Sequence, residues 1–257
     1  MLAWKYNSLS YSKGRNFSYL CEKLALKGVL YLIPSPLGDN DPAEVIPSSV
    51  LMLLPTLTHF FVEELRTARR YLSKTGLKGH IDSLKMYELN EHTGPALIEE
   101  YVKVLINGND AALISEAGLP AIADPGSQLV ALAHKNDIKV VPMSGPSSIV
   151  LALIASGMNG QNFAFNGYLP VKPDERKSKI KQLERVSAST GQSQIVIETP
   201  YRNNSLFNDI IQVCNNSTRL AVAANITLPD AFIKTKTVEE WKREKIDLNK
   251  KPCVFIL

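Results

Sequence analysis

Short apolar runs alternate with helical patterns from residue 29 onward, and this rhythm constrains the fold more than any other feature of the sequence. Runs such as VLYLIP (29–34) and DAALIS (110–115) have the length and composition of buried strands. The segment 94–109 instead repeats its apolar residues at helical spacing and ends in a turn-forming NGN. Strands that alternate with helices favour a mainly parallel sheet covered by helices on both faces.

The alternation of strand and helix patterns is interrupted at SGPSS (144–148) and resumes after the apolar helical stretch that follows it. In the second half the crossovers are shorter and residues 219–236 resemble a hairpin, which predicts a mixed sheet. We therefore expect an α/β fold of two domains, residues 29–143 and 144–257, with mainly parallel or mixed sheets. Residues 1–28 precede the first convincing strand and are expected to be an N-terminal extension.

Charge and cysteine content limit the class of protein. The formal net charge of +4 resides in residues 1–28, which hold five basic residues and one acidic residue, and the other 229 residues carry 24 of each. The body of the chain therefore lacks the bulk positive charge of a general nucleic-acid binder. Three widely spaced cysteines predict a cytoplasmic location, and no apolar run approaches the roughly 20 residues that span a bilayer, so no membrane partner is expected.

The sequence lacks the common phosphate-loop, zinc-protease and serine-hydrolase motifs, and its four histidines do not have metal-ligand spacing. No metal is therefore expected. The remaining candidates are loops at the carboxyl ends of strands, where open α/β sheets bind ligands. Four such loops are IPSPLGDN (33–40), EELRTARR (63–70), SEAGLPAIADPG (115–126) and ETPYRN (198–203). Each alone is compatible with a plain turn, but their recurrence on both sides of the expected boundary predicts one ligand cleft between the two domains.

These loops, together with NE (90–91), VVPMSGPSS (140–148) and FNGYLP (165–170), form an ordered set that resembles the tetrapyrrole methylase superfamily. Within it, the set is similar to the ribosomal RNA small subunit methyltransferase I branch, and the resemblance covers about residues 29–257. It implies S-adenosylmethionine (SAM) bound in the cleft, 2′-O-methylation of a nucleotide of small-subunit ribosomal RNA, and a homodimer.

The resemblance also implies which residues bind the cofactor. They lie in the loops at the strand ends and are Pro36, Ser115, Glu116, Ala117, Gly118, Leu119, Ile122, Ser147, Ser148, Thr199, Pro200, Tyr201 and Ala224. Backbone groups of loops shaped by proline and glycine supply directional hydrogen bonds without flexible side chains. Two acids of the third loop, Glu116 and Asp124, either favour the sulfonium electrostatically or cap the following helix, and the sequence leaves both open.

A ribose hydroxyl is a poor nucleophile and benefits from a general base or a hydrogen-bonding carboxylate. The candidate catalytic residues are Glu63, Glu64, Arg66, Glu91 and Glu198. Two further arginines, Arg69 and Arg202, are predicted to bind substrate phosphates, since a guanidinium holds a phosphate in a bidentate manner.

The sequence departs from the family pattern at several polar positions. Glu64 and Leu65 stand where the family has aspartate and threonine, Leu228 where it has lysine, and Ala231 and Phe232 where it has glutamates. Two alternatives therefore stay open beside RNA methylation. One is a SAM methyltransferase of a tetrapyrrole or another small molecule, and the other is a SAM-binding module with little catalysis.

Overall fold

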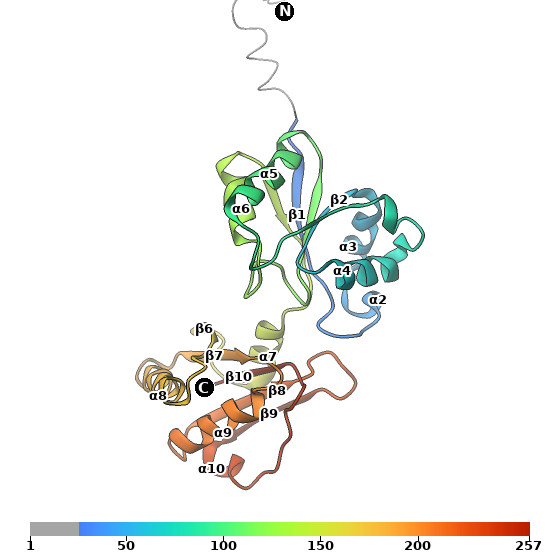
Figure 1. The fold of residues 1–257 in the computed structure, drawn as a ribbon. Helices are drawn as coiled ribbons and strands as arrows, with labels where there is room; N and C mark the ends of the chain where they lie inside the picture. Colours follow the sequence, from blue (N-terminus) through green and yellow to red (C-terminus); the bar gives the residue numbers. More distant parts are fainter. Residues whose placement is uncertain (1–25) are drawn as a thin grey trace, which may run out of the picture.

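The computed structural model describes residues 26–257, which form two five-stranded sheets joined at a narrow junction (Figure 1). The predicted extension at residues 1–28 lies almost entirely outside this range. The first sheet contains β1 (Val29–Ile33), β2 (His59–Val62), β3 (Lys85–Glu88), β4 (Ala111–Ile114) and β5 (Lys139–Pro142). Its strand order is β3-β2-β4-β1-β5, and every pairing in it is parallel, as the alternation of strands and helices predicts.

Helices cover both faces of the first sheet. On one face lie α2 (Pro42–Val45), α3 (Ser48–Leu53) and α4 (Leu65–Leu72), and on the other lie α5 (Pro95–Ile106) and α6 (Ser127–Lys135). Successive residues of β2 point to opposite faces of the sheet. Phe60 packs in the core on the side of α4, Phe61 packs in the core on the side of α5, and both are fully buried. This period of two, with apolar residues at every position, is what a strand buried on both faces requires.

The second sheet is mixed, also as predicted. It contains β6 (Phe163–Tyr168), β7 (Ser193–Glu198), β8 (Arg219–Ala224), β9 (Phe232–Thr237) and β10 (Cys253–Ile256). The strand order is β6-β7-β10-β8-β9, in which β6 and β7 are parallel and the other neighbours are antiparallel. The predicted hairpin is the β8–β9 pair, which is in register from Arg219–Thr237 to Ala224–Phe232.

One face of the second sheet is covered by α8 (Pro173–Thr190), α9 (Asn203–Val213) and α10 (Val238–Trp241), and the other by α7 (Ser148–Ser156). Trp241 is fully buried in the first of these layers, and its indole Nε1 donates a 2.8 Å hydrogen bond to the Leu220 carbonyl. β5 ends at Pro142 and α7 packs on the second sheet, and we propose that the domain boundary lies between residues 143 and 144.

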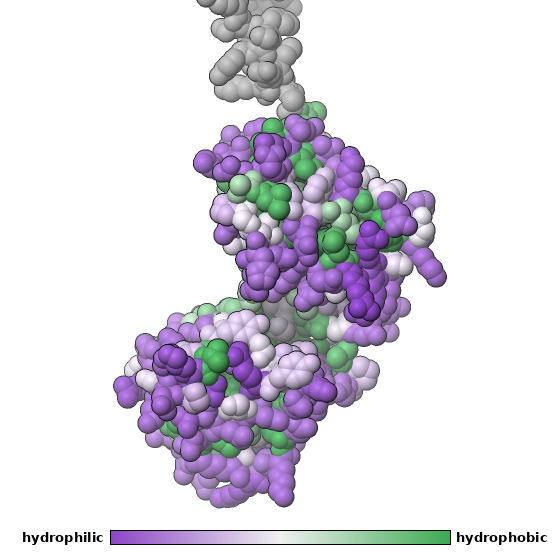
Figure 2. Space-filling model, in the orientation of Figure 1, coloured by the Kyte–Doolittle hydropathy of each residue, from purple (hydrophilic) through white to green (hydrophobic). Residues whose placement is uncertain are grey.

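Two uncharged side chains link the halves, which Figure 2 shows as two lobes with a hollow between them. The Asn40 amide Nδ2 donates to the Thr227 carbonyl at 2.8 Å, and the Thr227 hydroxyl donates to Asn40 Oδ1 at 3.0 Å. We call this reciprocal pair the Asn40–Thr227 clamp. Next to it, Leu228 lies so close to Gly38 that a Cβ on that glycine would be 2.8 Å from a leucine methyl carbon.

Candidate active site

Loops from the carboxyl ends of three parallel strands meet at one edge of the first sheet. The loop after β1 and the loop after β4 are joined by two backbone hydrogen bonds, from Ser35 N to Gly118 O at 2.9 Å and from Gly118 N to Ser35 O at 3.1 Å. The loop after β2 joins them, because the Glu116 amide donates to Glu63 Oε2 at 3.0 Å. Three of the four sequence-predicted loops are therefore held together at this edge.

The backbone of the loop after β4 is unusual. It has positive φ at Gly118 (80°), Ala121 (64°), Ala123 (64°) and Gly126 (125°). Alanine rarely adopts this region, and such strain tends to cluster at functional sites where the surrounding structure supports it. The unfavourable backbone conformations of the two alanines therefore indicate a functional loop and not a simple turn.

A cavity of about 220 Å³ lies between the two halves, opposite this loop. Its walls are mainly apolar, with a few polar groups, and consist of Leu37, Ala117, Ser148, Tyr168, Ile197, Glu198, Pro200, Asn225, Ile226, Pro252, Cys253 and Val254. Asn225 also has a positive φ, of 51°, and Thr227 two residues later has 74°. Asn225 therefore brings strained backbone to the wall of this inter-domain cavity, and from the first half Ala117, next to Gly118 of the loop after β4, lines it.

Glu198, at the end of β7, is the most distinctive group of the inter-domain cavity. Its side chain is fully buried, and its Oε1 accepts hydrogen bonds from the Thr199 amide at 2.7 Å and from Arg202 Nη2 at 2.6 Å. Its Oε2 is buried and has no hydrogen-bond partner among residues 26–257. A buried carboxylate oxygen without a donor is costly, so this atom is poised to accept a hydrogen bond from a ligand.

A second cavity, of about 740 Å³, opens at the ends of β2, β3 and β4. Five of its lining residues are acids, namely Glu63, Glu64, Glu91, Glu116 and Asp124. We call it the acid-lined cavity. Burial raises the pKa of Glu63, although the hydrogen bond from the Glu116 amide opposes this shift. Burial, reinforced by the negative charges of Glu63 and Glu116, raises the pKa of Asp124 to about 6.

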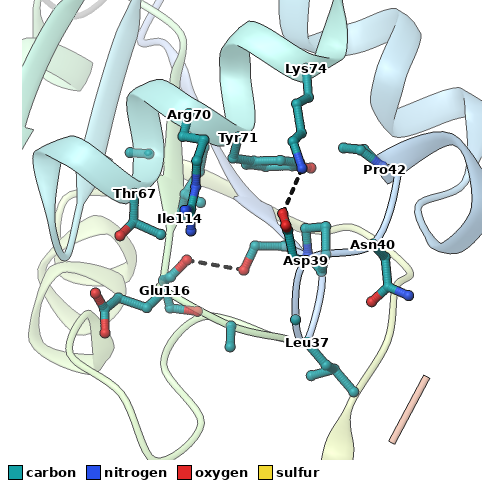
Figure 3. Close-up of a pocket in the computed structure, with 16 residues that line it drawn as sticks. Leu37, Asp39, Asn40, Pro42, Thr67, Arg70, Tyr71, Lys74, Ile114 and Glu116 are labelled. Atoms are coloured by element: carbon teal, nitrogen blue, oxygen red, sulfur yellow. Dashed lines mark hydrogen bonds and ion pairs between the residues drawn. The ribbon is translucent and has the colours of Figure 1, made fainter. Parts of the chain in front are cut away.

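Two further cavities flank α4. One, of about 210 Å³, is shown in Figure 3, where Lys74 reaches Asp39 and Arg70 lies on the far side near Glu116. Lys74 Nζ is 2.7 Å from Asp39 Oδ1. The other cavity, of about 450 Å³, is lined by Glu64, Arg66, Thr67, Arg70 and Glu116. Arg66 and Arg70 are four residues apart, which places them on the same face of the helix.

The predicted catalytic residues are brought to the ends of the strands, but not to one point. Glu63, Glu64 and Glu91 line the acid-lined cavity, Arg66 of α4 lines the cavity of about 450 Å³, and Glu198 lines the inter-domain cavity. Glu64 has a local task, since its carboxylate accepts from the amides of Arg66 and Thr67 and so caps α4.

The two predicted phosphate-binding arginines already have acidic partners. Arg69 Nη1 is 3.2 Å from Asp82 Oδ1, on the side of α4 away from the cavities, and Arg202 pairs with Glu198. Sequence reasoning passed over Arg70, which faces the cavities together with Arg66. Helical spacing alone does not choose between Arg69 and Arg70, because residues three and four positions after Arg66 both lie on its side of the helix.

The predicted cofactor residues divide into two groups. Those that line the cavities described above are Pro36, Ser115, Glu116, Ala117, Ser148 and Pro200. Those that lie beside these cavities without lining them are Gly118, Leu119, Ile122, Ser147, Thr199, Tyr201 and Ala224. In the second group Ser147 caps α7, Ala224 is fully buried in β8, and Tyr201 is 75% exposed.

Sequence reasoning did not select several residues that line the inter-domain cavity, among them Leu37, Tyr168 and Ile226. Tyr168 lines the acid-lined cavity as well, so it lies where the two cavities meet. Within residues 26–257, no three His, Cys, Asp or Glu side chains are grouped so as to hold a metal ion. In the same range, no helix has the length and apolar character needed to cross a membrane.

Comparison with known proteins identifies the family. The sequence profile of the tetrapyrrole (corrin/porphyrin) methylases matches residues 30–242. The chain belongs to the tetrapyrrole methylase family. The chain is therefore a methyltransferase, and its family membership implies a methyl donor.

Curated relatives of this methylase include three proteins named ribosomal RNA small subunit methyltransferase I. The protein from Vibrio cholerae is 30% identical over 84% of this chain and 74% of its own length. The one from Halalkalibacterium halodurans is 30% identical, over 85% and 72%, and the one from Escherichia coli O157:H7 is 28% identical, over 90% and 78%. The solved structure of the methyltransferase CobJ superposes with a TM-score of 0.58 at 14% identity, over 89% of this chain and 93% of CobJ, which shows a shared fold.

The raised pKa of Asp124 predicts a pH-dependent stability. Between about pH 4 and pH 6 the folded state binds a proton that the unfolded state has lost, so stability falls as the pH rises through this window. A shift from 3.8 to about 6 corresponds to about 3 kcal/mol at full effect, and we expect about 1 kcal/mol because Asp124 is only partly buried. Asp124→Asn should therefore be more stable than the wild type by about 1 kcal/mol at pH 7.5 and equal to it at pH 4.

Urea unfolding at the two pH values measures this difference. The matched control is Glu99→Gln, which neutralises an exposed acid on α5 and should shift neither curve. An Asp124→Asn variant that is less stable than the wild type at pH 7.5 would show that the carboxylate is stabilised, not penalised, by its surroundings.

Proposed function

We propose that this methylase uses SAM to methylate a ribose 2′-hydroxyl of small-subunit ribosomal RNA. The observation that carries the proposal is the unpartnered, buried Oε2 of Glu198 in the inter-domain cavity, since a hydroxyl that must lose a proton needs such an acceptor. The names of the relatives that align with 84–90% of the chain support ribosomal RNA as the class of acceptor.

The inter-domain cavity has the chemistry that SAM requires. Leu37, Ile226 and Val254 provide apolar walls for an adenine ring, and Ser148 and Asn225 provide hydroxyl and amide groups for its polar atoms. The carboxylate of Glu198 is a favourable neighbour for a sulfonium. When bound, SAM supplies an activated methyl group carried on this positively charged sulfur.

Among the four candidate bases, Glu198 is best suited to the acceptor hydroxyl. Glu64 is engaged as a helix cap, and the side chain of Glu91 is 83% exposed to water. Glu63 accepts a hydrogen bond from the Glu116 amide. In our proposal, Glu198 Oε2 would accept the proton of the acceptor hydroxyl, and Arg202 would stabilise the carboxylate through Oε1. The methyl group gained by the hydroxyl oxygen would come from bound SAM, with cleavage of its sulfur–methyl bond and a neutral thioether as the leaving group.

A small-molecule acceptor is the second candidate, and the segment after β8 favours it. Where the family pattern has a lysine and glutamates, Leu228 packs against Gly38, and Phe232 packs near Trp241 with ring centroids 6.3 Å apart. These apolar side chains consolidate the fold and offer no charge to RNA. A SAM-binding module with little catalysis is the third candidate, which the unpartnered oxygen of Glu198 argues against.

The proposed use of SAM is tested with Ala117→Phe. Ala117 is exposed and lines the inter-domain cavity, so a phenyl ring would fill the cavity without disturbing the core. We expect calorimetry to show micromolar-range SAM binding by the wild type and a dissociation constant at least about tenfold higher for the variant. Ala131→Phe, on the exposed side of α6, is the matched control and should bind like the wild type.

The proposed acceptor is tested with labelled SAM and small ribosomal subunits from a strain that lacks the relative of this enzyme. Label should appear on the RNA with the wild type and be lost with Ala117→Phe. SAM binding without label on the RNA would favour a small-molecule acceptor, and no SAM binding at all would refute both candidates.

Arg66 and Arg70 are proposed to bind the RNA backbone, since both face the cavity beside α4 and neither has an acidic partner within 4 Å among residues 26–257. Arg70→Ala should weaken RNA binding in a sequence-independent way and lower the slope of log affinity against log salt by about 1. Arg69→Ala is the matched comparison, and its pairing with Asp82 favours a smaller loss. Fluorescence anisotropy at several salt concentrations measures the RNA affinity of both variants. An equal loss of affinity in the two variants would show that Arg69 contacts the phosphates as much as Arg70 does.

A homodimer remains part of the proposal. The outer face of α7 exposes Val150 and Ile154, which are 48% and 72% exposed and lie four residues apart on one side of the helix. Sedimentation velocity should give twice the 28.4 kDa of one chain, and Ile154→Glu should shift the protein to the monomer. A wild-type protein that is monomeric at micromolar concentration would refute the proposed homodimer. A cytoplasmic location, where ribosomal RNA is found, also remains a proposal.

A further inference from the structure

Tyr168 occupies a position that the proposed function does not yet use. It is the last residue of β6, and its side chain lines both the acid-lined cavity and the inter-domain cavity. It is 56% exposed, so its ring is not a core packing element. A large aromatic side chain that separates two cavities is in a position to contact a ligand that enters either of them.

The local backbone directs Tyr168 toward this junction. The pairing of β6 with β7 runs in register to Phe165 and then shifts, so that Tyr168 pairs with Ile197, one residue before Glu198. Gly167, within the shift, has a φ of 65°. Irregularities of this kind bend a strand, re-aim a side chain, and are frequent next to active sites.

The groups that face Tyr168 come from both halves of the chain. Burial and the charges of Asp124, Glu198 and Glu63 raise the pKa of its phenol, while Arg202 opposes the shift. The phenol therefore stays protonated at neutral pH and does not act as a base. What Tyr168 offers to a ligand is a neutral aromatic ring beside three carboxylates.

The second observation is the unpartnered Oε2 of Glu198, fully buried in the cavity that Tyr168 also lines. The acid-lined cavity, which Tyr168 also lines, contains five carboxylates, and His92 is the only basic side chain among the described residues that line it. Such walls repel a phosphate and suit the N–H groups of a nucleobase, while a hydroxyl of the same nucleotide would be the donor that Glu198 lacks.

We propose that Tyr168 is the platform on which the base of the acceptor nucleotide stacks, so that the base enters the acid-lined cavity and the ribose hydroxyl meets Glu198. The inference rests on the proposed function, and it assigns the base and the sugar to two different cavities. Proteins that bind unpaired RNA commonly hold bases by stacking them on aromatic side chains.

Three variants distinguish the contribution of the aromatic ring of Tyr168 from that of its hydroxyl. Tyr168→Ala removes the stack and should lower kcat/KM for small ribosomal subunits about 10- to 100-fold, mainly through KM. Tyr168→Phe keeps the ring and should stay within about threefold of the wild type. Phe163→Ala, at the exposed start of the same strand, is the matched control and should behave like the wild type. Thermal unfolding of each variant checks that the fold is retained.

A binding measurement makes the test independent of methyl transfer. The affinity for a fluorescein-labelled single-stranded RNA, measured by anisotropy without SAM, should fall for Tyr168→Ala and persist for Tyr168→Phe. If the wild type binds this RNA with that pattern but transfers no methyl group, the platform stands and the proposed reaction fails. If the wild type methylates RNA and Tyr168→Ala does so equally well, the platform fails and the reaction stands.

Two further outcomes would overturn the inference. Equal losses in Tyr168→Phe and Tyr168→Ala would assign the role to the hydroxyl. A Tyr168→Ala variant with weaker SAM binding in calorimetry, but unchanged RNA affinity and KM, would assign the ring to the cofactor.

Discussion

The arrangement of the site depends on the pair of backbone hydrogen bonds between Ser35 and Gly118. They join the loops that follow β1 and β4, two adjacent parallel strands whose carboxyl ends open at the same edge of the sheet. Because both partners are backbone groups, the geometry does not depend on flexible side chains. The loop after β4 can therefore keep left-handed residues at Ala121 and Ala123, whose conformations a free loop would relax.

The same edge of the sheet concentrates negative charge that the fold does not neutralise. Burial raises the pKa of Glu63 and Asp124, and neither has a basic partner within 4 Å among the described residues. Such an arrangement lowers the stability of the empty protein and is retained where function requires it. Glu198 is different, because Arg202 neutralises one of its oxygens and leaves the other for a ligand.

Much of the fold was predictable from local pattern, whereas the site was predictable only in part. Fully apolar runs such as HFFV (59–62) signal a strand buried on both faces, and the shorter crossovers signal the mixed sheet. The short helices α2 and α3 were not predicted, since four and six residues are too few to show a helical period. Motifs located the loops, but the roles of Arg69 and Arg70 depend on which side of α4 faces the cavities.

Tyr168 shows the limit of motif reading most clearly. It lies in the motif FNGYLP (165–170), and the role that we propose for it depends on the register shift next to it and on residues of the other half, which no local pattern reveals. Glu198 was predicted from its position at a strand end, yet the availability of one oxygen becomes visible only when Thr199 and Arg202 are placed around it.

The Asn40–Thr227 clamp has a consequence for how the two halves respond to their surroundings. An amide and a hydroxyl exchange hydrogen bonds there, with Leu228 packed alongside, so this contact between the halves carries no net charge. Dissolved ions screen charged contacts and scarcely affect such a junction. Raising the ionic strength would thus loosen a polyanionic substrate from the arginines of α4 while the gap between the halves kept its shape. If the proposed function holds, the protein could in this way release a large acceptor without opening the cavity between the halves, where we propose that the small donor binds.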